Sequence, residues 1–203
     1  MKWVLASNNA GKLSEFKQLF AAHGIDFIAQ GELGVEDADE TGLSFIENAL
    51  IKARHAAART GLPAVADDSG LCVDALHGAP GIRSARFSGS HGNAAANNAL
   101  LLEKLAGVDA AARTAHFVCA LAFVRTPEDP EPVIGQGRWS GRILNAPEGT
   151  GGFGYDPLFF DPREAMSAAA MPAELKHRIS HRAQAMAALR AALVDAGHTF
   201  PGN

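Results

Sequence analysis

The sequence is poor in cysteine and has no long apolar run. These absences argue against a disulfide-stabilised secreted protein and against a membrane-spanning protein. Two of the 203 residues are cysteine, Cys72 and Cys119, and both lie in apolar sequence. Without a signal peptide we expect reduced thiols rather than a disulfide. No run approaches the ~18 apolar residues of a membrane span, and the N-terminal run is shorter than the roughly 7–15 residues of a secretory signal core. The cytoplasm is therefore the expected location.

The sequence also lacks an excess of positive charge. It has 18 Lys and Arg against 22 Asp and Glu, a net charge of −4, which gives no general basic surface for DNA or RNA. An anionic ligand would have to be held by local cations, backbone N–H groups or a metal ion. The 47% apolar and 20% charged residues are typical of a soluble globular protein, and we expect a single domain over residues 1–203.

The order of apolar segments in the first third of the chain indicates an α/β fold. Short apolar runs typical of buried strands alternate there with amphipathic segments typical of helices. In order they predict strand 2–6, helix 12–22, strand 25–29, helix 43–59 and strand 62–66. The sequence Ser44-Phe-Ile-Glu47 is a capping box that sets the start of the second helix, and Gly61 ends it. Alternating strands and helices are the pattern of βαβ units.

The rest of the chain is richer in loop residues, beginning directly after Ala66. A helix is predicted near 94–105 and a final helix over 180–196. Two strongly β-prone runs, 116–124 and 133–144, predict a long antiparallel hairpin. The alanine-rich segment 165–173 is interpreted as a surface loop or a weak helix.

The polar turn Ser-Asn-Asn-Ala-Gly-Lys, residues 7–12, separates the first strand from the first helix. Lys12 falls in the first turn of that helix, where the helix dipole makes a cation unfavourable by a few tenths of a kcal/mol. The free N–H groups at such a junction bind anions, and a phosphate there would offset this cost. The alternative is an ordinary capped helix with a solvated lysine.

Two adjacent carboxylates, Asp67 and Asp68, follow directly on the third predicted strand. Desolvated carboxylates side by side are costly unless cations or hydrogen bonds compensate. Neighbouring strand residues point to opposite faces, so the two are expected to have different roles. The acidic segment 36–40 could supply a second ligand for Mg²⁺, which usually takes one or two protein carboxylates with substrate phosphates. An Asx-turn and a solvated acidic loop are the alternatives.

Two later segments are candidates for binding a planar ligand. In residues 151–157, Gly-Gly-Phe-Gly-Tyr-Asp-Pro, glycines allow close approach and either Phe153 or Tyr155 could stack on a base, while Asp156 could accept a hydrogen bond from it. The basic cluster over 176–182 suits a phosphate or a purine oxygen. The alternatives are a glycine-rich turn with core aromatics and a solvated basic face.

Together these motifs resemble the inosine/xanthosine triphosphate pyrophosphatase family. The matching segments are SNNAGK (7–12), ETGLSFIENALIKA (40–53), ADDSGL (66–71), GAPGIRSARFSG (78–89), GTGGFGYDP (149–157) and SHR (180–182). The resemblance implies an elongated mixed central sheet with flanking helices and two lobes around a nucleotide cleft. It also implies a homodimer, and Mg²⁺-dependent hydrolysis of ITP, dITP and XTP to monophosphate and pyrophosphate.

The resemblance assigns roles to single residues. Asp68 is implied as general base and Mg²⁺ ligand, with either Glu40 or Asp39 as the second metal contact. The implied substrate-binding residues are Ser7, Asn8, Asn9, Ala10, Gly11, Lys12 and Lys52 at the triphosphate, Ser69 beside Asp68, and Phe153, Gly154, Tyr155, Asp156, Lys176, His181 and Arg182 at the base.

Two other functions remain as alternatives. One is a Maf-type pyrophosphatase of modified pyrimidine nucleotides, although the Ser-Asn-Asn-Ala-Gly-Lys turn differs from the Ser-x-x-Arg-Arg character of that family's opening. The other is a nucleotide-binding module without turnover, which would need the phosphate turn but not Asp68. Neither nucleic acid nor a membrane is expected as a partner.

Overall fold

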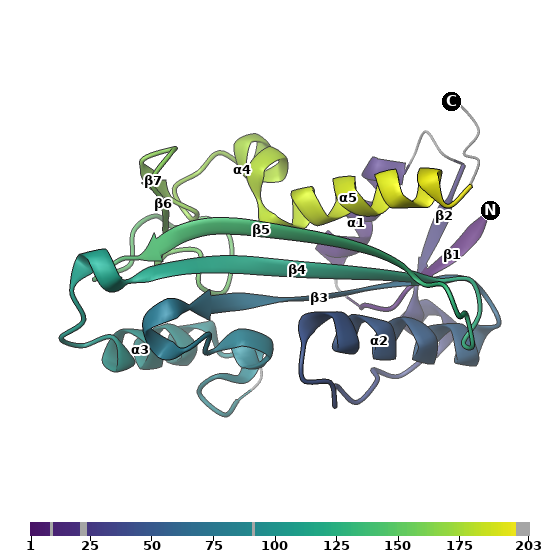
Figure 1. The fold of residues 1–203 in the computed structure, drawn as a ribbon, viewed down its shortest axis with the longest axis horizontal. Helices are drawn as coiled ribbons and strands as arrows, with labels where there is room; N and C mark the ends of the chain where they lie inside the picture. The colour runs from purple at the N-terminus through teal and green to yellow at the C-terminus, as the bar shows by residue number, and fades with distance from the viewer. Residues whose placement is uncertain (9, 21–23, 91, 198–203) are drawn as a thin grey trace. The chain divides into compact units, whose positions relative to one another are not determined.

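The structure, a computed structural model, describes residues 1–8, 10–20, 24–90 and 92–197 (Figure 1). Within these ranges seven strands form one sheet in the order β2-β1-β3-β4-β5-β6-β7. The strands are β1 (Lys2–Leu5), β2 (Asp26–Ala29), β3 (Ala64–Val73), β4 (Thr114–Val124), β5 (Val133–Ile143), β6 (Phe159–Asp161) and β7 (Met166–Ser167). β1 pairs in parallel with β2 and β3, whereas β6 pairs antiparallel with β5 and β7. The predicted α/β fold with a mixed sheet is confirmed.

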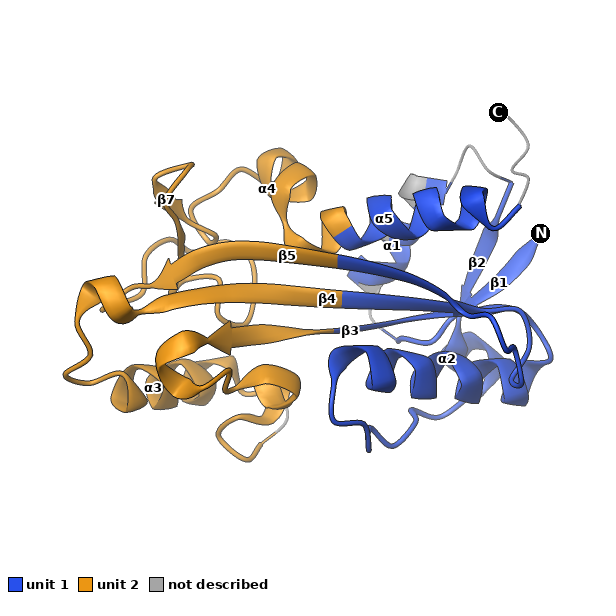
Figure 2. Ribbon diagram, in the orientation of Figure 1, with its two compact units in different colours: residues 1–68, 120–136, 185–203 blue, residues 69–119, 137–184 orange. Residues whose placement is uncertain are grey.

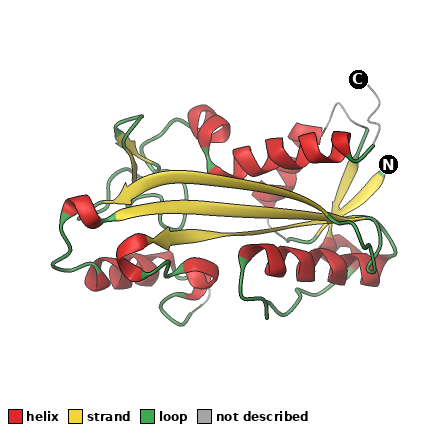
Figure 3. Ribbon diagram, viewed as in Figure 1, coloured by secondary structure: helices red, strands yellow, loops and turns green. Residues whose placement is uncertain are grey.

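Helices flank this sheet (Figure 3). They are α1 (Ala10–Phe20), α2 (Phe45–Thr60), α3 (Ala94–Lys104), α4 (Ala173–Ile179) and α5 (His181–Asp195), with short 3₁₀ helices η2 (Gln30–Leu33), η3 (Asp74–Leu76), η4 (Gly81–Arg86) and η5 (Ala110–Ala112). None of the helices in the described ranges is both long and apolar enough to cross a membrane.

The start of α2 is fixed as the sequence predicts. The Ser44 side chain accepts a hydrogen bond from the Glu47 backbone N–H, and the Glu47 carboxylate accepts from Leu43 N–H and from the Ser44 hydroxyl. At the other end, Gly61 adopts a left-handed conformation with φ 68°. The capping box and the glycine stop therefore determine which turn of α2 each later residue occupies.

The chain divides into two compact units (Figure 2). Unit 1 comprises residues 1–68, 120–136 and 185–203, and unit 2 comprises residues 69–119 and 137–184. One boundary falls inside β3, so Asp68 ends the first segment of unit 1 and Ser69 begins unit 2.

The two faces of the sheet in unit 1 differ in composition, because successive side chains of each strand point to opposite faces. One face carries aromatic rings from three strands, which pack with Phe16 and Phe20 of α1. The other face packs against a stripe of fully buried alanines on α2, which are Ala49, Ala53, Ala56 and Ala57. Within β1, Trp3 belongs to the aromatic face and Val4 to the alanine face. Methyl groups fill little space, so α2 can lie close to β3.

The predicted end of the third strand is wrong. β3 does not stop at Ala66 but continues through the Asp-Asp-Ser-Gly sequence to Val73. Its burial is almost continuous, and Leu71 and Val73 belong to the core of unit 2. Asp67 and Asp68 therefore lie within a buried strand rather than in a loop after it.

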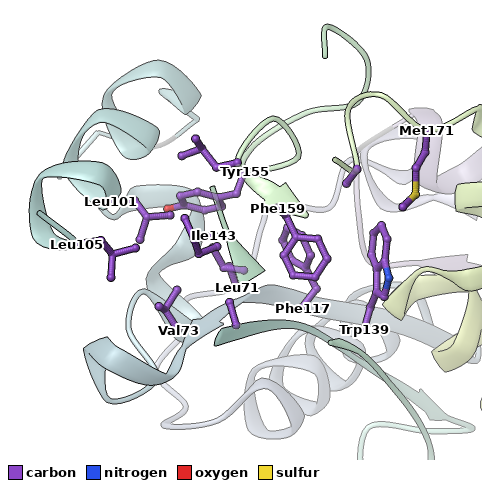
Figure 4. Close-up of a cluster of buried hydrophobic side chains, with 13 residues drawn as sticks. Leu71, Val73, Leu101, Leu105, Phe117, Trp139, Ile143, Tyr155, Phe159 and Met171 are labelled. Atoms are coloured by element: carbon purple, nitrogen blue, oxygen red, sulfur yellow. The ribbon is translucent and has the colours of Figure 1, made fainter. Parts of the chain in front are cut away.

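The core of unit 2 is formed by strands, α3 and the glycine-rich segment together (Figure 4). The interpretation of residues 165–173 as a surface loop or weak helix is wrong. The segment contains β7, and Ala168, Ala169 and Met171 are buried. Small alanines fit here because the backbone of Gly149 and Gly151 passes directly over Ala169, whose carbonyl accepts from Gly151 N–H.

Both cysteines are reduced thiols rather than a disulfide, as predicted from their apolar surroundings. Cys119 is buried in β4, and Cys72 is half-buried in β3. Burial raises the pKa of the Cys72 thiol, an effect that the charge of Arg138 opposes and that of Asp74 reinforces. The thiol form is therefore favoured, which fits a structural role for this cysteine.

Candidate functional site

Three ionisable side chains meet on the α2 side of β3. The Lys52 ammonium donates to Asp68 Oδ1 at 3.1 Å and to Glu40 Oε1 at 2.8 Å. Lys52 follows the buried Ala49 and precedes the buried Ala53 on α2, which places it at the border of the alanine stripe. Asp68 lies two and four residues after Ala66 and Ala64, so its side chain points to the same face of β3. Ala64 and Ala66 pack against the alanine stripe of α2 on that face. One lysine thus holds two carboxylates together.

Burial sets the proton affinity of this cluster. It raises the pKa of Asp68; the charge of Lys52 opposes the shift, that of Glu40 adds to it, and the net shift is upward. Burial acts to lower the pKa of Lys52, but the neighbouring carboxylates, Asp68 foremost, outweigh it and the net shift is upward. Asp68 is therefore a better proton acceptor than an ordinary aspartate, beside a lysine that stays charged.

Asp67 faces the opposite side of β3, toward α1. Its side chain is 1% exposed, and its Oδ1 accepts from the Lys12 ammonium at 2.8 Å. The two neighbouring carboxylates thus lie on opposite faces of the strand, as alternation predicts, and they contact different lysines; their different roles stay a prediction. The alternative of a solvated Lys12 is wrong, because the lysine is bound to a buried carboxylate. That ion pair offsets the cost of a cation in the first turn of α1.

The turn before α1 is held partly by the segment around η2. Asn8 Oδ1 accepts from Gly31 N–H at 2.8 Å, and its Nδ2 donates to Asp37 Oδ1 at 3.3 Å. Ser7 is half-buried and Gly11 is exposed, whereas Asn9 lies outside the described residues. The backbone at Ala10 begins α1. The side chain of Asn8 thus helps to fix the shape of the turn before a helix N-terminus, a position that in general favours anions.

Glu40, not its neighbour Asp39, is turned toward Asp68. Asp39 is exposed, and Glu40 is half-buried and bound to Lys52. Among the described residues, no group of three or more His, Cys, Asp or Glu could hold a metal ion without other ligands. A pair of carboxylate oxygens fits Mg²⁺, which takes hard oxygen ligands and commonly only one or two from the protein. The half-buried Ser69 follows Asp68 in β3.

In unit 2 an exposed aromatic ring lies near two cations. Phe153 is 67% exposed. The Lys176 ammonium and the Arg182 guanidinium carbon lie 5.2 Å and 5.8 Å from the centroid of its ring. Phe153 follows Gly152 and precedes Gly154, both with positive φ, at 72° and 60°. Such an open ring flanked by hydrogen-bond donors can stack on a planar polar ligand.

The loop that carries the Phe153 ring is held by the buried carboxylate of Asp156. Asp156 Oδ2 accepts from Phe153 N–H at 2.7 Å and from the Lys176 ammonium at 2.5 Å, and Asp156 is 3% exposed. The Gly154 carbonyl accepts from Asn98 Nδ2 at 2.9 Å. The side chain of Asp156 thus positions Phe153 and Lys176 instead of facing solvent.

Three other predicted base-binding residues are buried: Tyr155, His181 and Arg182. The Tyr155 hydroxyl donates to the Ser84 carbonyl at 2.9 Å, and its ring lies in the core of unit 2 (Figure 4). The His181 ring stacks on Phe117 with centroids 4.8 Å apart. Of the two aromatic candidates for stacking, the structure therefore exposes Phe153 and buries Tyr155.

Reasoning from the sequence gave no role to Asn48, which contacts Asp68. Its Nδ2 donates to Asp68 Oδ2 at 3.3 Å. The available signal was the spacing: Asn48 lies four residues before Lys52, and side chains at this separation share one face of a helix. A polar residue beside a stripe of alanines was also a sign of a buried contact.

Comparison with known proteins adds independent information. A sequence profile of the Ham1 family matches residues 3–192. The dITP/XTP pyrophosphatase of Xanthomonas oryzae pv. oryzae is 58% identical over 187 residues, 92% of this chain and 94% of its own. That of Bordetella pertussis is 58% identical over 189 residues, 92% of this chain and 88% of its own. Among solved structures, a HAM1 protein from Coxiella burnetii has a TM-score of 0.92 at 45% identity, covering 96% of this chain and 99% of its own.

The ion pair between Lys12 and Asp67 predicts a loss of stability on mutation. Lys12→Ala should lower the melting temperature, because removing one partner of a fully buried pair costs about 3–5 kcal/mol. The cost should be smaller here, because 24% of the lysine side chain is exposed. In a double-mutant cycle with Asp67→Asn, followed by thermal unfolding, the two losses should be clearly non-additive. Additive losses would show that the pair contributes nothing of its own.

Proposed function

This chain belongs to the Ham1 family. We propose that it hydrolyses the deaminated purine nucleotides dITP, ITP and XTP to the monophosphate and pyrophosphate. The observation that carries the proposal is the buried Asp68, held by Lys52 beside Glu40. The relatives named dITP/XTP pyrophosphatase that match over 92% of the chain support the choice of substrate.

Asp68 is the proposed general base. Its carboxylate takes a proton from a water molecule whose oxygen attacks the α-phosphorus of the nucleotide. The bond from that phosphorus to the bridging oxygen breaks, and pyrophosphate leaves with the bonding electrons. Burial raises the pKa of Asp68, which brings a carboxylate closer to the affinity that proton transfer near neutral pH requires.

Asp68 and Glu40 are also the proposed ligands of Mg²⁺. The two carboxylates that share Lys52 would supply two hard oxygen ligands. Water and phosphate oxygens would suit the remaining coordination positions of the ion. When bound, the ion would neutralise phosphate charge and make the phosphorus more electrophilic. Lys52 supplies a second positive charge at the same place, and its raised pKa keeps it protonated.

The triphosphate is proposed to bind at the N-terminus of α1, over residues 7–12. Free N–H groups and the helix dipole favour an anion there. Lys12 adds charge from the first turn of the helix, although its contact with Asp67 means that it is shared between protein and ligand. Lys52 adds a second cation on the α2 side of β3, where it is paired with Asp68 and Glu40.

The base is proposed to stack on Phe153 in unit 2, with Lys176, His181 and Arg182 as donors. Deaminated purines have an oxygen acceptor at C6, where adenine has an amine. An amine facing these donors would leave them unpaired, which is a large penalty in a buried site. Gly154, Tyr155 and Asp156 are proposed to hold the loop in shape, since Tyr155 and Asp156 are buried.

A substrate panel tests the proposed reaction. With Mg²⁺ present, pyrophosphate release should be fast from dITP, ITP and XTP and slow from ATP and GTP. Asp68→Asn should abolish release, because an amide cannot accept the proton, and general-base catalysis contributes typically 10²–10⁴-fold. Turnover confined to modified pyrimidine nucleotides would indicate the Maf-type reaction. Nucleotide binding without any turnover would indicate a regulatory module.

Removal of the metal tests the ligand assignment. EDTA should abolish turnover and added Mg²⁺ should restore it. Glu40→Gln should raise the Mg²⁺ concentration needed for half-maximal activity, because it removes one anionic oxygen ligand. Asp39→Asn is the matched control and should leave this concentration unchanged, since Asp39 is exposed. Turnover that is independent of metal would contradict the assignment.

A homodimer in the cytoplasm is proposed on family grounds. Light scattering should give a mass twice that of the 21.2 kDa chain. The measurement should be repeated over a range of protein concentrations, because a weak dimer dissociates on dilution. A mass of one chain at all concentrations would overturn this part of the proposal.

A further inference from the structure

Asn48 is a polar side chain without any exposure. It lies in the first turns of α2 beside Ala49, and both are 0% exposed. A buried amide has two donor hydrogens and an acceptor oxygen, and leaving these groups without partners costs free energy. Its partners therefore reveal why asparagine stands here rather than another alanine.

The contacts of Asn48 allow one orientation of its amide. The Gly42 backbone N–H donates to Asn48 Oδ1 at 2.8 Å. Because a backbone N–H is only a donor, the oxygen of the amide must face it. The nitrogen then faces Asp68, and Nδ2 donates to Oδ2 at 3.3 Å. A flipped amide would place its oxygen against the carboxylate and its nitrogen against the N–H.

Asp68 thus has a donor from α2 on each of its oxygens. Lys52 donates to Oδ1 and Asn48 donates to Oδ2. The two donors are one helical turn apart on the same rigid helix. A carboxylate held at both oxygens cannot rotate about its terminal bond without losing one of these contacts.

The same two residues also hold the acidic segment. Lys52 reaches Glu40, and Asn48 accepts from Gly42, two residues further on. A Cβ at position 42 would lie 2.7 Å from Asn48 Oδ1 and 2.6 Å from Glu47 Cβ, so glycine permits this close approach. The segment that carries Glu40 and the strand that carries Asp68 are therefore both tied to one face of α2.

We infer that Asn48 is a positioning residue, which orients the Asp68 carboxylate for its reaction with water by binding Oδ2 while Gly42 fixes the amide. The inference rests on the proposed function, in which Asp68 acts on the attacking water. The contacts of Asn48 are with Gly42 and Asp68, and it is not proposed as a ligand of the metal or the substrate. A purely structural role would stabilise the start of α2 without affecting the geometry of Asp68.

The first variant is Asn48→Asp, which keeps an oxygen for Gly42 N–H and replaces the donor to Asp68 by a second oxygen, with added negative charge. We expect kcat for dITP to fall by about 10- to 100-fold, since displacing a reacting group by 1 Å can cost 10²-fold. KM should change little, because substrate binding does not use this contact. Asn48→Leu, which removes both contacts without adding charge, should lower kcat in the same way.

Ser44→Ala is the matched control on the same helix. It removes the side-chain cap of α2 but no contact of Asp68, so it should lower the melting temperature and leave kcat near wild type. If Ser44→Ala and Asn48→Leu lose kcat in proportion to their loss of melting temperature, Asn48 acts only through the helix and the inference is wrong. A rise in KM at unchanged kcat would also overturn it.

A measurement without turnover separates this inference from the proposed function. The side-chain amide resonance of Asn48 is compared in ¹⁵N spectra of the wild-type protein and of the Asp68→Ala variant. It should differ between the two, because the variant lacks the acceptor of this amide. Asn97, a buried asparagine bound to backbone groups, provides the control signal and should not move. An unchanged Asn48 signal would refute the contact. Wild-type protein that hydrolyses no nucleotide would refute the function, and the spectrum would still decide on the contact.

Discussion

Two adjacent carboxylates inside a buried strand are the constraint on which the rest of unit 1 depends. Asp67 and Asp68 are 2% and 8% exposed, and each would be costly to ionise without compensation. Because the strand alternates, the compensation must come from both sides of the sheet. α1 brings Lys12 to one side and α2 brings Lys52 to the other. The two helices thus provide charge as well as apolar packing.

Unit 2 solves the same problem in another way. Asp156 is as buried as Asp67 and is likewise paired with one lysine. Its second partner is a backbone N–H in its own loop, so the carboxylate determines the conformation of the residues just before it. The result is an exposed Phe153 ring on a loop whose base is rigid. A buried charge here holds the loop of the proposed base-binding residues, whereas at Asp68 it is part of the proposed chemistry.

Local patterns were enough to predict most helices and strands, because capping boxes, glycine stops and apolar spacing act over a few residues; the roles of the site residues came from the family resemblance and stay predictions. The alternation rule also gave the opposite faces on which Asp67 and Asp68 lie. The continuation of β3 could not be predicted, because Asp-Asp-Ser-Gly is typical of a loop. It becomes a strand through lysines that lie 55 and 16 residues away in sequence. Asn48 was overlooked because its partner in β3 is equally remote, 20 residues along the chain.

The alanine stripe of α2 has a consequence for how this protein can change. The separation of helix and strand is set by methyl groups, the smallest side chains that still exclude water. Leucine or valine at such a position would add volume that a close-packed interior absorbs only by moving the helix. Such a movement would carry Asn48 and Lys52 away from Asp68 together. Substitutions in the alanine stripe of α2 are therefore limited by the distance over which Asn48 and Lys52 can still contact Asp68. The packing of the helix and the proposed chemistry depend on the same separation between α2 and β3.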